Sequence, residues 1–261
     1  IAGNVITGCT YDASTSGSFY GIWNSGDPML LHIRGNLFHN NSTSTSSGST
    51  YLLYNNGDPL LTTVRENTLA FRFNGSVQYS GTMYGIYNSS AAAGATVDLS
   101  RNVFRDIAHV NQNGTGNIYL LNNSAPCTQL TADSNMVHDL VLMHQANVYC
   151  VFSGASTTSL LAIRSNTITN ISRSSSAFDF FGVYAASASS SSATHVITGN
   201  FVGNLAEVAG GPGDFAGIYD VAGNTSPFPQ KVVSHNTVMN IQSLAIGNFH
   251  GLYVTDLGHG T

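Results

Sequence analysis

One short pattern recurs through the whole chain: an asparagine, any residue, and then an apolar residue. Its eight copies begin at Asn4, Asn36, Asn67, Asn102, Asn135, Asn166, Asn200 and Asn236, and successive copies are 31 to 36 residues apart. A repeat period of about 20 to 50 residues is typical of chains that stack equivalent structural units. The repeat therefore constrains the fold more than any other feature of this sequence.

A second block of strand-forming residues lies between successive asparagines. Residues 20–23 read Tyr-Gly-Ile-Trp and residues 84–87 read Tyr-Gly-Ile-Tyr; the third residue of the block is Ile, Leu or Val in all eight copies, and the fourth is aromatic in seven. Residues of these types favour strands. We expect three short strands per repeat, before the asparagine, after it and in this block. Turns are predicted at 26–28, 57–59 and 210–213, and loops at 42–47 and 189–192.

These patterns predict an all-β fold: one parallel β-solenoid domain over residues 1–261, with about eight coils and with loop insertions. Each strand should stack on its counterpart in the next coil, about 4.8 Å away. We expect the eight asparagines to form one column at a tight corner, because asparagine tolerates the left-handed backbone conformation. Stacked amides can also hydrogen-bond along such a column. The asparagines are therefore interpreted as a structural ladder and not as a binding site.

Three strings of the repeat resemble right-handed parallel β-helix proteins: Gly-Asn-Val-Ile-Thr at 3–7, Tyr-Gly-Ile-Tyr-Asn at 84–88 and Ser-Asn-Thr-Ile-Thr-Asn at 165–170. Such repeats occur in pectate-lyase-like enzymes, alginate epimerases, phage tailspikes, autotransporter passengers and secreted surface proteins. The resemblance covers essentially the whole chain and implies the fold, but not a function, because one fold hosts many activities. Coils of that family are usually shorter, so we place extra loop before each aromatic block.

The charge composition argues against two classes of partner. Charged residues make up 8% of the chain, the formal net charge is −5 and Lys231 is the only lysine. Nucleic-acid binding needs clustered Lys and Arg, and anionic membranes attract polybasic segments. No apolar run approaches the roughly 20 residues of a membrane span. We expect neither nucleic-acid binding nor membrane insertion.

The sequence contains no recognisable catalytic or metal-binding motif. Pectate-lyase-like enzymes need several acids and a base on one face of neighbouring coils, yet no repeat position stacks three acids. Asp27 and Asp58 share a Gly-Asp-Pro turn. Asp106 and Asp139 share a position that other repeats fill with asparagine, which favours a structural role. We therefore predict no enzyme activity, no catalytic residue, no metal site and no cofactor.

Two further groups of residues leave alternatives open. Arg34, Arg65 and Arg164 lie two positions before ladder asparagines, with Glu66 as a candidate partner. They form either a site for a sugar acid or a solvated outer face. The cysteines are Cys9, Cys127 and Cys150, and they match no disulfide framework. Either Cys127 and Cys150 form one bridge, or both are buried thiols.

The fourth residues of the second block form a predicted aromatic column: Trp23, Tyr54, Tyr87, Phe152, Tyr184, Tyr219 and Tyr253. Strand alternation places this column opposite the aliphatic third residues, so it faces outward if the aliphatics face inward. Exposed rings could stack on sugars or pack against a neighbouring filament. The alternative is that loops fold over the rings and bury them.

Asn-x-Ser/Thr sequences mark candidate glycosylation sites at Asn40, Asn41, Asn74, Asn88, Asn113, Asn122, Asn170 and Asn224. All lie in predicted loops or at strand ends, where a source with the machinery could attach glycans.

We expect a structural protein located outside the cell or on its surface: a subunit or segment of a fibre, sheath or filament. A polysaccharide lyase or hydrolase and an adhesin or receptor-binding shaft are the alternatives, and carbohydrate is a possible partner. The chain begins and ends within the repeat pattern and shows no capping element. Because an uncapped solenoid exposes sheet edges, we expect end-to-end self-association, unless the sequence is part of a longer chain.

Overall fold

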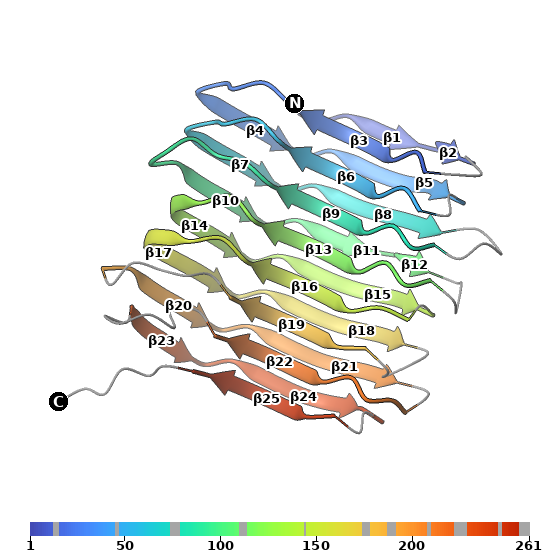
Figure 1. The fold of residues 1–261 in the computed structure, drawn as a ribbon, viewed down its shortest axis with the longest axis vertical. Coiled ribbons are helices and arrows are strands. Elements are labelled where there is room, and N and C mark those ends of the chain that lie inside the picture. Colours follow the sequence, from blue (N-terminus) through green and yellow to red (C-terminus); the bar gives the residue numbers. More distant parts are fainter. Residues whose placement is uncertain are drawn as a thin grey trace.

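The computed structural model is a right-handed parallel β-helix whose coils stack along one axis (Figure 1). It describes residues 1–12, 16–44, 47–73, 79–109, 114–143, 145–173, 178–186, 192–207, 210–221, 229–244 and 247–255. The described residues form 25 strands and no helix, and the chain completes about seven turns, close to the eight coils predicted. The predicted all-β solenoid is confirmed.

Three parallel sheets form the sides of the coil (Figure 1). Sheet A precedes the ladder asparagines and contains β4 (Leu30–Arg34), β7 (Leu61–Arg65), β10 (Thr96–Ser100), β14 (Cys127–Asp133), β17 (Thr157–Arg164), β20 (Thr194–Thr198) and β23 (Gln230–Ser234). Sheet B follows the asparagines and contains β1 (Val5–Thr7), β2 (Thr10–Tyr11), β5 (Leu37–Thr43), β8 (Thr68–Phe73), β11 (Val103–Arg105), β12 (Ala108–His109), β15 (Met136–Leu142), β18 (Thr167–Arg173), β21 (Phe201–Glu207) and β24 (Thr237–Gln242). Sheet C carries the aromatic blocks and contains β3 (Phe19–Asn24), β6 (Thr50–Asn55), β9 (Met83–Asn88), β13 (Ile118–Asn123), β16 (Val148–Ser153), β19 (Phe180–Ala185), β22 (Phe215–Asp220) and β25 (Phe249–Val254).

The strands pair in the register that the repeat predicts. Ile33 lies opposite Val64 in sheet A, and Tyr51 lies opposite Tyr84 in sheet C. Each repeat contributes one strand to each sheet, except that no sheet A strand precedes Asn4 and that sheet B is split into two short strands in two repeats. Because equivalent residues stack, the inward columns of the three sheets merge into one continuous apolar core that follows the axis.

The strands of sheet C bend in the middle of the aromatic block. Leu52 and Leu53 are consecutive, yet both are buried. The second residue of the block is skipped in the pairing, so the first and fourth residues both face outward. Glycine often fills the second position: a Cβ on Gly85 would approach the Phe104 ring and the Leu120 carbonyl oxygen.

The corner between sheets A and B corrects one expectation. The left-handed conformation belongs to the residue before each ladder asparagine and not to the asparagine itself. These residues have φ between 54° and 68°; they are Gly3, Gly35, Glu66, Arg101, Ser134, Ser165, Gly199 and His235. The left-handed residue turns the chain, and the next residue can then direct its amide along the axis.

The predicted loops are only partly described. Strand β5 extends to Thr43, and Ser42 and Thr43 are buried, so the prediction of a loop was wrong for these two residues. Their side chains contact the preceding coil at Thr10 and Tyr11. Most insertions expected before the aromatic blocks, such as 74–78 and 174–177, and all of the serine run except Ser192, lie outside the described residues.

Candidate functional site: ladders and outer faces

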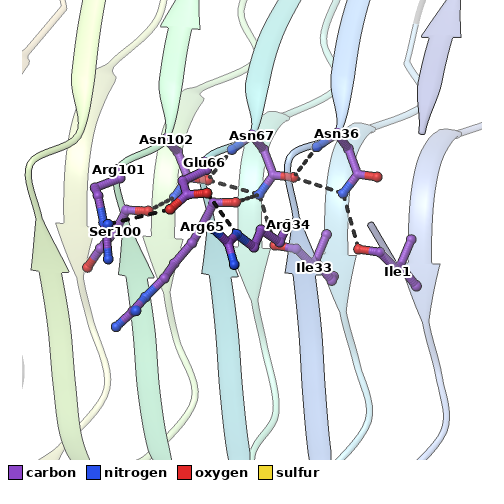
Figure 2. A network of polar contacts seen from close by, with 10 residues as sticks. All are labelled: Ile1, Ile33, Arg34, Asn36, Arg65, Glu66, Asn67, Ser100, Arg101 and Asn102. Atoms are coloured by element: carbon purple, nitrogen blue, oxygen red, sulfur yellow. Dashed lines mark hydrogen bonds and ion pairs between the residues drawn. The ribbon is translucent and has the colours of Figure 1, made fainter. Parts of the chain in front are cut away.

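The eight predicted asparagines form one hydrogen-bonded ladder along the axis. Asn67 Nδ2 donates to Asn102 Oδ1 at 3.0 Å, and the same contact recurs at every step from Asn4 to Asn236. The Asn67 backbone N–H donates to the same oxygen, and its Nδ2 also donates to the Ile33 carbonyl. Figure 2 shows these bonds at Asn36, Asn67 and Asn102. The predicted structural role is confirmed.

Two more amide ladders were not recognised in the sequence. One follows the aromatic block directly and runs through Asn24, Asn55, Asn88 and Asn123, with each Nδ2 donating to the next Oδ1 at 2.7 Å. The other precedes sheet C, where each backbone N–H meets the side chain of the preceding member; its members are Asn117, Asn147, Asp179, Asp214 and Asn248. An asparagine after the aromatic residue in three of the first four repeats was the signal for the first ladder.

Burial divides the candidate glycosylation sites. Asn41, Asn88 and Asn122 are buried, so the folded chain cannot carry a glycan on them, and these three predictions were wrong. Asn40 and Asn170 are exposed. Asn74, Asn113 and Asn224 lie outside the described residues.

Asp106 and Asp139 lie on the outer side of sheet B in a position that demands a left-handed backbone. Their φ values are 51° and 57°, and the asparagines that replace them in other repeats have similar values. The Asn170 amide donates to Asp139 at 3.3 Å. A hydrogen bond to His138, 2.7 Å away, holds the pKa of the Asp139 carboxyl below its usual range. These contacts agree with the structural role predicted for the position.

The arginines at the ends of the sheet A strands and at the following corner meet acids from neighbouring coils. Arg34 Nε lies 2.7 Å from Glu66 Oε2, and Arg101 Nη1 lies 3.4 Å from Glu66 Oε1, as Figure 2 shows. Arg65 pairs with Asp98. The hydrogen bond from Arg34 is the main cause that lowers the pKa of Glu66. The predicted Arg34–Glu66 partnership is confirmed, whereas Arg101 and Asp98 had not been singled out.

These five charged residues border a groove of about 690 Å³ on the outer side of sheet A. Its floor includes Leu61, Thr63 and Thr96. The third predicted arginine, Arg164, does not line this groove, because it belongs to β17, three coils beyond β7.

Sheet C presents two adjacent columns of rings to the outside. The fourth residues of the blocks form the predicted column, and Tyr54 stacks on Tyr87 at 5.3 Å with an interplanar angle of 4°. The first residues form a second column that was not predicted, with Tyr20 and Tyr84 each 5.0 Å from Tyr51. Trp23 is 53% exposed and the other fourth-position rings are half-buried. The outward orientation of the predicted column is therefore confirmed.

The stacking limits what these rings can bind. Most ring faces are covered by the ring of the adjacent coil, so mainly ring edges and phenol groups face solvent. Sugars stack on ring faces, and such faces are scarce here. Burial raises the pKa of Tyr149 to about 12, with a smaller contribution from the charge of Tyr119.

Two ion pairs lie inside the solenoid near its C-terminal coils. Arg173 Nη1 is 2.8 Å from Glu207 Oε1, and Lys231 Nζ is 3.2 Å from Asp220 Oδ2, with all four side chains at most 2% exposed. Beside Lys231, the buried His195 has its pKa lowered to about 4, first by burial and then by the lysine charge. Sequence reasoning singled out neither pair, although Arg173 and Glu207 lie opposite each other in β18 and β21, one repeat apart. Lys231 and Asp220 belong to different sheets, so the repeat spacing alone did not indicate their contact.

The thiols are free: Cys127 and Cys150 are buried and Cys9 is exposed, so the alternative of a Cys127–Cys150 bridge is wrong.

Within the described ranges, no three or more His, Cys, Asp or Glu residues are grouped to hold a metal ion. No described helix is long and apolar enough to span a membrane. Comparison of the chain with family models, curated proteins and solved structures gave no match.

Proposed function

We propose that this chain is a structural protein of the cell exterior: a rigid subunit or segment of a surface fibre, sheath or filament that associates end to end. The observation that carries the proposal is the unbroken asparagine ladder, in which each coil offers the next the same amide and backbone contacts. A coil of a second molecule can make the same contacts, because solenoid units interact mainly with their nearest neighbours.

The charged side chains support this proposal, because their contacts serve the fold. Glu66 and Asp98 neutralise stacked arginines, and the buried Arg173 and Lys231 are paired inside the core. The outer face of sheet C carries uncharged rings over most of its length. Such a surface suits lateral packing, since aromatic residues are enriched and charges depleted at protein interfaces.

Sedimentation and electron microscopy of the purified chain test the association. We expect a mass that rises with concentration, and rods built from units roughly 34 Å long, which is seven strand spacings of about 4.8 Å. A single monomeric species at every concentration, with no rods, would overturn the proposal.

The same proposal includes the lack of a catalytic centre. Incubation with a panel of acidic and neutral polysaccharides should release no products. Release of products that stops in Asp106→Asn or Asp139→Asn would contradict this. Both variants keep a residue that other repeats accommodate at this left-handed position, so the fold is preserved.

A carbohydrate-binding adhesin shaft is the second candidate, favoured by the groove beside Arg34, Arg65 and Arg101. Three arginines against Glu66 and Asp98 leave this surface with a net positive charge on a chain of net charge −5. Guanidinium groups have five donors each, so paired arginines still have N–H groups for a ligand carboxylate.

Calorimetry with an acidic oligouronate and a neutral oligoglucan tests this role. The acidic probe alone should bind, and Arg34→Ala should remove the binding. Arg105→Ala is the matched control, because Arg105 lies on sheet B, away from the groove. Absent binding, or equal loss in both variants, would exclude the adhesin role at this groove.

A further inference from the structure

Oxidisable rings form a continuous file from the first coil to the last. Ten of the twelve tyrosines and the single tryptophan belong to the two ring columns of sheet C. One path through them visits Trp23, Tyr20, Tyr51, Tyr84, Tyr119, Tyr149, Tyr184, Tyr219 and Tyr253. Successive ring centroids on this path are 4.6 to 5.6 Å apart, so every step joins rings in contact.

We propose that this file conducts one-electron oxidising equivalents along the rod. The inference is independent of the structural role proposed above. A one-electron oxidant, such as a metal-centred or photo-excited acceptor, removes an electron from the first ring of the file. The oxidised ring is then reduced by the ring stacked on it, so the electron vacancy moves one coil at a time. Direct contact between rings favours each transfer, because electronic coupling falls steeply with distance.

Each tyrosine step balances an electron against a proton. A tyrosine that gives up an electron breaks its phenolic O–H bond and releases the proton to water, which leaves a neutral radical. When the next tyrosine reduces that radical, the first phenol regains a proton from water. The rings of Tyr119, Tyr149 and Tyr184 are half-buried, so they stack on their neighbours and remain close to solvent.

The number of oxidisable rings per coil changes along the file, and this change makes the inference testable. The first three coils each offer two oxidisable rings, such as Tyr51 beside Tyr54. From the fourth coil onward each coil offers one, because the companion positions hold Asn122, Phe152, Phe181, Ala216 and His250. Replacing Tyr119 therefore leaves a gap of two strand spacings, roughly 9.6 Å. Replacing Tyr54 leaves the route through Tyr51 intact.

The experiment oxidises a ring in the first coil and detects the oxidation at the last coil. A ruthenium photosensitiser is attached to Cys9, the exposed thiol, while Cys127 and Cys150 are buried. The sample is illuminated with a sacrificial electron acceptor and a radical trap, and peptide mapping locates the trapped rings. We expect adducts at Tyr253 in the unmodified sequence and in Tyr54→Phe. Tyr119→Phe should lose them and keep the adducts on the first three coils.

The variants should fold, because phenylalanine already occupies equivalent stacked positions at Phe152 and Phe181. Circular dichroism verifies this for each variant. A mixture of labelled Tyr119→Phe with unlabelled native chain detects transfer between molecules. Adducts at Tyr253 on the labelled Tyr119→Phe chain, or no such adducts on the labelled chain of unmodified sequence, would overturn the proposal.

Discussion

Replacement of Asn135 by leucine tests how much the ladder contributes to stability. Asn135 is 2% exposed; its Oδ1 accepts the Asn102 backbone N–H at 2.9 Å, and its Nδ2 donates to the Leu99 carbonyl at 2.8 Å. Leucine satisfies neither group. A buried polar group that loses its partner costs about 1–3 kcal/mol, so two such groups predict a loss of about 2–6 kcal/mol.

The other two bonds of Asn135 add less to this estimate. Asn102 Nδ2 keeps its contacts with the Val64 and Ser100 carbonyls, and Asn166 Oδ1 keeps the Asn135 backbone N–H. Equilibrium unfolding in urea, followed by circular dichroism, measures the change in the free energy of unfolding. Asn56→Leu is the matched control on an exposed residue, expected to stay within about 0.5 kcal/mol of the native chain. Equal effects of the two substitutions would refute the reasoning.

Three further predictions concern the core and the corners. The pKa of His195 is about 4 in the folded chain, below its usual value of 6.5. The unfolded chain therefore takes up the proton first, and the free energy of unfolding should fall as pH drops from 6.5 toward 4. In His195→Gln the urea midpoint should depend less on pH, and an unchanged pH dependence would contradict the argument. Arg173→Met leaves the Glu207 carboxylate without its ion-pair partner in the core and should lower the free energy of unfolding by about 3–5 kcal/mol. A double-mutant cycle with Glu207→Gln measures the coupling between the two side chains, and additive effects would refute the predicted coupling. Gly81→Ala places a Cβ against the Gly48 backbone and should lower the free energy of unfolding, measured in urea, by about 1–3 kcal/mol. In Gly26→Ala the new Cβ meets no neighbouring atom, so the loss of stability should be smaller. Equal losses in the two variants would show that crowding is not the cause.

The architecture and one of its ladders could be predicted from the sequence alone. A fixed period with an apolar residue near each asparagine predicts a solenoid, in which equivalent strands stack on one another and share a core. The same period placed the eight asparagines in one column, and strand alternation gave the outward orientation of Trp23 and Tyr54. These conclusions held because they depend on residues one repeat apart, and a solenoid turns that spacing directly into contact.

Contacts between different columns were decided only by the tertiary structure. The second ring column depends on the bend at Leu52 and Leu53, where both residues turn inward, and strict alternation could not indicate that bend. The pairing of Lys231 with Asp220 joins sheet A to sheet C across a corner, so the path of the chain around that corner sets it. Burial of Asn41 likewise depends on the left-handed turn at Asn40, which reverses the side on which the following side chain lies. The period determines which residues stack along the axis, whereas backbone conformation at the bends and corners determines which stacked columns face each other.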